Sequence, residues 1–504
     1  MDSSGHIAAV GTTAEIEKLG AQRVVNAPGT LVVPGFVDSH VHFVDGGFAL
    51  ASVQLRDAKT RAEFITRIRD YAKTLPKGAW VTNGDWDHTN WGGDLPRRDW
   101  IDSVTPDNPV AINRLDGHMI LANSAALTLA HLSRETTDVP GGEIVRDATG
   151  ELTGVFKDNA ADLVYTMMPA PPPAIEDRAL DTAMAYVASY GVTSVVNMGT
   201  WRDLAVFERA HGTARMKTRI YAAVPLAQWA QLRDTVAARG RGNEWLQIGG
   251  LKGFVDGSLG SHTAAMFDGF SDKPTDKGFF VTPPESLYAR TSGADRAGLQ
   301  VIVHAIGDRA IATQLDIFQR VAMEDGPRDR RFRIEHAQHI AAKDMPRFAA
   351  LGVIPSMQPY HAIDDGRWAD KLIGADRASR TYAFRSLLDS KAQLAFGSDW
   401  FVAPPRPMEG VYAAVTRRTL DDRNPDGWVP SQKITVEEAL RAYTRAGAYA
   451  AFNEKNRGTL EVGKLADFAI LERDITTMPP SQIRGVRVIR TVVGGRSVFE
   501  RQAR

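Results

Sequence analysis

Two histidines stand one residue apart at the end of an apolar run, in the segment Pro34-Gly-Phe-Val-Asp-Ser-His-Val-His-Phe43. Alternate residues of a strand share a face, so His40 and His42 are expected to point the same way. Two adjacent imidazoles are half of what a metal site requires. The alternative is a half-buried strand that carries both histidines without a metal. The remaining ligands must come from elsewhere in the chain.

Further candidate ligands follow other apolar runs. His304, His336 and Asp399 each stand at the end of a run, and Lys252 lies within another. Imidazole and carboxylate ligands that leave one position open are typical of a catalytic zinc site. A buried ammonium is costly, so Lys252 has two possible roles. It points to an external charge partner, or carbon dioxide carbamylates it and makes it an anionic bridging ligand.

Eight short strand-like runs alternate with helical patterns. They cover residues 36–42, 191–197, 219–224, 248–256, 299–304, 332–336, 353–358 and 394–399. Several are almost continuously apolar, as parallel strands covered on both faces should be. Eight strands in alternation with helices predict an α/β fold, a (β/α)8 TIM barrel. Active sites of such barrels lie at the carboxyl ends of the strands, where these candidates stand.

The alternation of strands and helices is interrupted by one long stretch and does not extend to either end of the chain. Residues 58–180 are too long for a loop, so they predict an inserted subdomain after the first barrel strand, closed by the prolines of 169–173. Residues 1–30 and 455–504 predict a composite small β-sandwich, with N-terminal strands at 6–10 and 23–25. The barrel itself takes 31–57 and 181–454. A capping box at Thr435 predicts a helix to about Phe452.

Composition excludes several classes of function. The chain has 60 basic and 60 acidic residues and no cysteine. A balanced charge argues against nucleic acid or an anionic membrane as partner, and thiol catalysis and thiolate ligands are excluded. No stretch is long and apolar enough for a membrane span, and the first residues lack a signal peptide pattern. We expect a cytoplasmic protein with a small-molecule substrate, as a homodimer.

Together these motifs resemble the amidohydrolase superfamily. They are His40-Val-His42, Val303-His-Ala-Ile-Gly-Asp308, Arg333-Ile-Glu-His-Ala-Gln338 and Gly397-Ser-Asp399. Three more segments, 114–118, 251–263 and 458–467, are similar to the YtcJ-like branch, amidohydrolase family 3, which includes N-substituted formamide deformylases. The resemblance implies one or two divalent ions, expected to be Zn²⁺, bound by His40, His42, His304, His336 and Asp399. It also implies that Lys252 is N6-carboxylated and bridges two ions.

Family members begin with a strand before the stretch that matches residues 5–11, and here almost nothing precedes it. We therefore expect that the true start lies upstream of Met1.

The expected reaction is hydrolysis of a non-peptide amide or N-formyl bond by a metal-activated hydroxide, with Asp399 as the proton carrier. An ester, lactone or phosphoester is an alternative substrate for the same site, since fold does not fix function. A non-catalytic metal-binding homologue is the third possibility. His118, Gln358 and His361 are the predicted substrate contacts.

Overall fold

The computed structural model describes residues 1–502, and its centre is a parallel eight-stranded sheet. In sheet order the strands are β2 (Phe36–Val41), β8 (Val192–Met198), β9 (Arg219–Pro225), β10 (Leu246–Phe254), β11 (Gln300–Ala305), β12 (Arg333–His336), β13 (Ile354–Met357) and β14 (Ala395–Phe396). A parallel bridge from Val41 to Trp400 joins the last strand region to the first. All eight predicted strands are therefore confirmed, in a TIM barrel.

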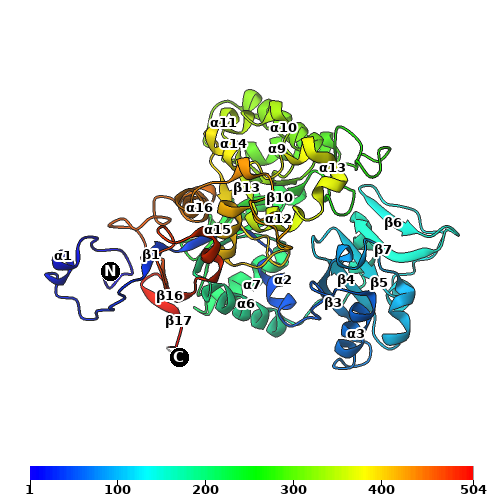
Figure 1. Cartoon of the computed structure of the whole chain (residues 1–504), viewed down its shortest axis with the longest axis horizontal. Coiled ribbons are helices and arrows are strands. Elements are labelled where there is room, and N and C mark those ends of the chain that lie inside the picture. The colour runs from blue at the N-terminus through cyan, green and yellow to red at the C-terminus, as the bar shows by residue number, and fades with distance from the viewer. Residues whose placement is uncertain (503–504) are drawn as a thin grey trace.

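Helices follow the barrel strands and pack around them (Figure 1). They are α2 (Phe43–Ala49), α6 (Pro173–Ala188), α7 (Trp201–Gly212), α8 (Trp229–Arg239), α9 (Pro284–Arg296), α10 (Asp308–Asp325), α11 (Arg347–Leu351), α12 (Pro359–Asp365), α13 (Ala369–Ala378), α14 (Phe384–Asp389), α15 (Pro407–Thr416), α16 (Val436–Tyr443) and α17 (Arg445–Ala450). The predicted single helix after Thr435 is two, because Thr444 leaves helical geometry at φ −127° and ψ −86°. Within residues 1–502, no helix combines the length and the apolar character that a membrane span needs.

Both chain ends contribute to one four-stranded antiparallel sheet. Its order is β1 (Leu31–Pro34), β15 (Phe468–Leu471), β16 (Val488–Val493) and β17 (Arg496–Glu500). The predicted strands at 6–10 and 23–25 are not formed: His6 makes a single bridge to Leu465, and the short helix α1 (Thr13–Glu17) lies between. Val10, Val24 and Val25 are exposed, so most of the apolar side chains of these runs cover no surface and gain little from pairing, although Ile7 is buried.

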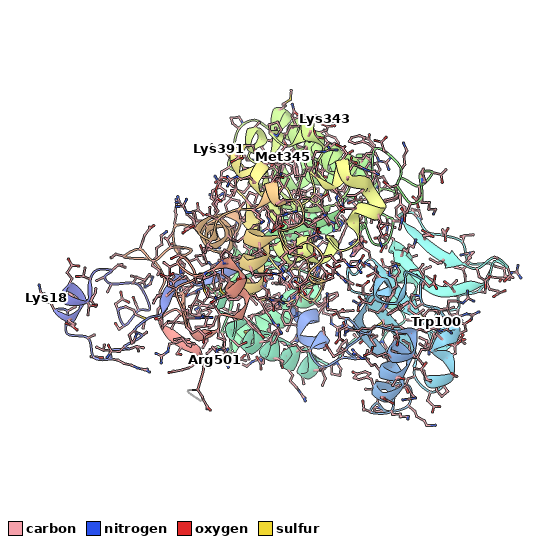
Figure 2. The ribbon with its side chains drawn as sticks, in the orientation of Figure 1. Lys18, Trp100, Lys343, Met345, Lys391 and Arg501 are labelled. Atoms are coloured by element: carbon pink, nitrogen blue, oxygen red, sulfur yellow. The ribbon has the colours of Figure 1, made fainter. Side chains whose placement is uncertain are left out.

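The insertion between β2 and β8 folds around a second sheet with its own core. The sheet order is β3 (Val81–Trp86), β4 (Val110–Arg114), β5 (Met119–Ala122), β7 (Leu152–Asp158) and β6 (Gly142–Arg146), accompanied by α3 (Arg61–Ala72), α4 (Ser124–Leu129) and α5 (Asp162–Tyr165). Figure 2 labels Trp100 in this insertion and Lys18 near α1, at opposite ends of the long axis of the molecule. The barrel lies between the two appendages.

Candidate metal centre

The six residues predicted as metal ligands gather at the carboxyl ends of the barrel strands. They are His40 and His42 at and after the end of β2, Lys252 in β10, His304 in β11, His336 at the end of β12 and Asp399 after β14. All strands of the barrel are parallel, so these ends meet on one face. The fold thus brings together residues that lie up to 359 positions apart (399 − 40) in the sequence.

Asp399 is the centre of the first group. Its Oδ1 lies 3.3 Å from Nε2 of His40 and 3.4 Å from Nε2 of His42. The backbone holds this arrangement, because the Asp399 amide donates to the His40 carbonyl at 2.7 Å. The His42 amide donates to the Trp400 carbonyl at 2.6 Å. One carboxylate oxygen and two imidazole nitrogens therefore converge on one point, as a zinc-type site requires.

The other oxygen of Asp399 faces a second group. Oδ2 lies 3.9 Å from Nδ1 of His336, and one ligand atom each from His336, His361 and Asp399 lie within 4.8 Å of one another. His361, predicted as a substrate contact, is thus placed where it could bind a metal. Its Nε2 is buried and has no hydrogen-bond partner among the described residues. An orphaned nitrogen beside a carboxylate fits a metal ligand.

The protonation states favour cation binding. Burial lowers the pKa of His40 and of His304 well below the usual value, and that of His336 to about 3. Burial alone would raise the pKa of Asp399, but the hydrogen bond from His42 and the nearby imidazoles lower it far below its usual range. Neutral imidazoles and an ionised carboxylate are the forms that coordinate metals.

Lys252 reaches the same centre from β10. Its Nζ lies 3.5 Å from Nε2 of His40, and the residue is only 5% exposed. Burial lowers the pKa of its amine to about 8. The ammonium also lies 4.8 Å from the ring centroid of Phe254. Lys252 therefore points into the site and not to an external charge partner.

A buried ion pair holds His40 from behind. Nδ1 of His40 lies 2.6 Å from Glu335 Oε2, and the Arg333 guanidinium donates to both Glu335 oxygens at 2.8 and 3.0 Å. This contact leaves Nε2 of His40 free to face Asp399, as carboxylate–histidine pairs do behind metals. Neither Glu335 nor Arg333 was predicted from the sequence as a partner of His40. The available signal was two opposite charges at alternate positions of a buried strand.

His304 and His336 are held in different ways. Nε2 of His304 contacts the Gly257 carbonyl at 3.0 Å, which leaves Nδ1 for a metal. Nδ1 of His336 lies 2.9 Å from Oε1 of Gln358. Gln358 is fully buried and does not line the cavity, which corrects its predicted role as a substrate contact. Its Oε1 orients His336, while its Nε2 is buried and has no hydrogen-bond partner among the described residues.

Two of these residues have unusual backbone geometry. His336 has φ +67° and Asp399 has φ +61°, both in the left-handed region. For residues other than glycine such conformations are uncommon and cost of order 1–3 kcal/mol. The surrounding structure must impose them, and strain of this kind gathers at functional sites.

His118 is the one predicted substrate contact that comes from the insertion. Its Nδ1 lies 2.6 Å from Oδ1 of Asp158, and its ring centroid lies 4.7 Å from that of His304. Burial disfavours the charged ring, but Asp158 outweighs this effect and raises the pKa of His118. The insertion therefore places a histidine against a predicted metal ligand.

A cavity opens onto these groups between the barrel and the insertion. It is lined by His118, His304, His336, His361 and Asp399, and farther out by Arg114, Asp116, Asp364, Arg367 and Trp368. Arg114 is paired with Asp116, and Arg367 with Asp364. The charges of these two arginines in the wall are therefore compensated by neighbouring carboxylates.

Several known proteins are similar to this chain in sequence and in fold. The sequence pattern of a family described as an amidohydrolase family matches residues 23–499. The chain is 40% identical to Protein LONG AFTER FAR-RED 3 of Arabidopsis thaliana, over 94% of this chain and 83% of that protein. It is 28% identical to the N-substituted formamide deformylase of Arthrobacter pascens, over 99% of this chain and 94% of that protein.

A crystal structure of an uncharacterised metal-dependent hydrolase from Pyrococcus horikoshii aligns with a TM-score of 0.76 at 28% identity. The alignment covers 95% of this chain and 94% of that chain. Motifs, barrel and similarities agree over nearly the whole length. The chain therefore belongs to the amidohydrolase family of metal-dependent hydrolases, in its YtcJ-like branch.

Proposed function

We propose that this protein hydrolyses a non-peptide carbon–nitrogen bond of a small linear amide or N-formyl compound. The observation that carries the proposal is the pair of ligand groups that share Asp399, one with His40 and His42, the other with His336 and His361. The similarity to a formamide deformylase over nearly the full chain supports the choice of bond. The compensated charges of the cavity wall support a small, uncharged reacting group.

The bound cation in this proposal is Zn²⁺, as one or two ions. Imidazole nitrogens and carboxylate oxygens, without thiolates, are ligands that zinc accepts. His40, His42 and Asp399 would hold one ion. His304 and His336, with His361 beside Asp399, would hold the other. Lys252, 3.5 Å from Nε2 of His40, would supply oxygens to both once its amine is carboxylated. When bound, the metal polarises the substrate carbonyl and lowers the pKa of water.

Asp399 moves the proton in this reaction. Its carboxylate is ionised and sits between the two histidine groups, so it can accept the proton of the attacking water. It then delivers that proton to the leaving nitrogen, which departs as an amine. The left-handed backbone at Asp399 fixes the direction of the carboxylate before substrate binds.

Metal removal and a matched substrate panel test the proposal. The protein is stripped with a chelator, reloaded with zinc, and assayed on N-formyl amines, linear amides and esters that share the same acyl group. We expect hydrolysis of an N-formyl compound or an amide that is lost on stripping and returns with zinc. Hydrolysis of the esters alone would overturn the choice of bond. Turnover that survives complete metal removal would overturn the metal-dependent mechanism.

A further inference from the structure

The insertion contributes a fixed histidine–aspartate pair to the cavity. His118 directly precedes β5 and Asp158 ends β7, and these strands pair antiparallel with Met119 opposite Lys157. The Asp158 amide also donates to the His118 carbonyl at 3.1 Å. Sheet pairing therefore sets the two side chains beside each other, with Nδ1 and Oδ1 2.6 Å apart.

The His118 ring continues a row of imidazoles. Its centroid lies 4.7 Å from that of His304, which lies 4.6 Å from that of His336. Asp399 stands at the other end of this row, beside His336. Since Nδ1 of His118 is engaged by Asp158, Nε2 is the nitrogen left for another partner. Among the described residues no hydrogen bond reaches Nε2, and the His118 side chain is 12% exposed in the cavity.

A barrel loop is shaped around the same pair. A Cβ on Gly257 would lie 2.7 Å from both carboxylate oxygens of Asp158 and 2.0 Å from Thr263 Oγ1, so only glycine fits. The carbonyl of this glycine is the one that contacts His304 at 3.0 Å. One residue thus touches both the aspartate and a metal ligand. Asp158 itself has φ +46°, a strained value that the surroundings must hold in place.

We propose that His118 is a catalytic residue that donates a hydrogen bond from Nε2–H to the reacting carbonyl oxygen of the substrate, and that Asp158, which accepts from Nδ1–H, positions it. Both ring nitrogens carry a proton in this role. The carbonyl is held at the His304 end of the imidazole row, while the leaving nitrogen faces Asp399 at the other end. The insertion is then part of the active site and not only a cover over it. This inference rests on the proposed function only in requiring a substrate that carries a carbonyl group.

A double-mutant cycle tests it with the zinc-loaded full-length chain. The variants are His118→Asn, Asp158→Asn and the pair together, assayed on the substrate that the unmodified protein hydrolyses fastest. We expect His118→Asn to lower kcat about 100-fold, with a smaller change in KM, as the loss of one oxyanion donor does. Asp158→Asn should lower kcat about tenfold. The double variant should match His118→Asn alone, because Asp158 acts through His118.

The proposal would be overturned if the double variant lost kcat by the product of the two single-variant factors. A kcat within threefold of normal in His118→Asn would also overturn it. A binding measurement gives a second readout. Calorimetry with acetohydroxamate, a carbonyl compound that binds metals, should show affinity about tenfold weaker in His118→Asn at equal zinc content. Equal affinity would contradict the carbonyl contact.

A second histidine–aspartate pair offers a matched control. His262 contacts Asp272 at 3.0 Å outside the cavity lining, and at φ +56° it has a backbone that asparagine tolerates. His262→Asn should keep normal kcat. A loss of kcat there as large as in His118→Asn would show that both losses come from a disturbed fold and would overturn the role of His118. If the protein hydrolyses only esters, the proposed carbon–nitrogen activity fails, while the cycle run on the ester still decides the role of His118.

Discussion

Two histidines of this site carry the same contact in different surroundings. His40 in the barrel and His118 in the insertion each place Nδ1 2.6 Å from a carboxylate oxygen. Behind His40, Glu335 is in turn held by Arg333, and all three side chains are fully buried. Behind His118, no arginine or lysine pairs with Asp158 in the part of the chain that the structure describes, and its Oδ2 has no partner there.

The difference separates two tasks. A carboxylate locked by a guanidinium cannot follow its histidine, which suits a ligand whose position must stay fixed. The Asp158 carboxylate has no such cation behind it in the described residues, and sheet pairing with the His118 strand sets its place. The barrel therefore supplies a ligand backed by a paired charge, and the insertion supplies a histidine backed by a carboxylate alone. Each prediction below alters one side of this comparison.

The largest effect is expected at the other nitrogen of His40, where Asp399 lies 3.3 Å from Nε2. Asp399→Asn keeps an oxygen that can bind a metal but cannot accept a proton. We expect kcat to fall by about 10²- to 10⁴-fold, with zinc content by elemental analysis unchanged. A kcat near normal would remove Asp399 from the proton path. Loss of zinc along with activity would show that its role is coordination alone.

The second test compares the two carboxylates in stability. Glu335→Gln leaves the buried Arg333 guanidinium without a counter-charge, which costs about 3–5 kcal/mol. Asp158→Asn leaves no buried arginine behind, so we expect a loss of about 1 kcal/mol. Thermal unfolding of the metal-free protein should therefore show a clearly larger fall in Tm for Glu335→Gln. Equal shifts would contradict the difference between the two pairs.

A rescue variant sharpens that result. If the loss comes from an unpaired cation, replacing both partners by apolar residues should recover much of the Tm. Arg333→Met with Glu335→Leu makes this replacement. Its zinc affinity should still be about 10- to 100-fold weaker, since nothing then orients His40. A double variant no more stable than Glu335→Gln would show that the ion pair itself holds the strands together.

The barrel and its ligand positions could be predicted from the sequence because strand periodicity and chain order determine them. Alternation placed His40 and His42 on one side, and all eight strands lie where apolar runs predicted them. The same reasoning failed for residues 6–10 and 23–25, where Val10, Val24 and Val25 remain exposed. A short apolar run does not reveal from the sequence whether another strand lies beside it to pair with.

The contacts behind the ligands could not be predicted, because they join distant segments at specific distances. Glu335 reaches His40 across 295 residues, and Gly257 accommodates Asp158 from another sheet. Gln358 was assigned to the cavity by its place after a strand, yet the amide turns inward to His336. Periodicity predicts the face of the strand toward which a side chain leaves the backbone. These contacts depend in addition on the direction of the rest of the side chain and on loop shape.

The smallest predicted effect concerns a barrel carboxylate that lacks any cation. Asp38 accepts hydrogen bonds from the Ser398 amide at 2.8 Å and hydroxyl at 2.5 Å, and from the His40 amide at 3.3 Å. Burial raises its pKa to about 7. The unfolded chain releases this proton near pH 4. The stability that Asp38 contributes is therefore complete below pH 4 and is lost as the pH rises through 7.

Asp38→Asn removes this titration but keeps an oxygen for both amides, and its NH₂ group can donate to the Ser398 hydroxyl oxygen. Compared with the unmodified protein, the variant should thus gain about 2–3 kcal/mol between pH 5 and pH 8. Tm values of metal-free protein at both pH values measure this gain without the pH dependence of metal binding. Asp107→Asn, at a carboxylate that is 50% exposed, is the control and should show no comparable gain.

The contrary outcome is a stability difference between Asp38→Asn and the unmodified protein that stays flat or falls as the pH rises. Asp38 is then ionised in the folded protein at neutral pH. A carboxylate buried without an arginine would then be stable in the barrel too, and the contrast between Glu335 and Asp158 would not reflect a general need for a counter-charge.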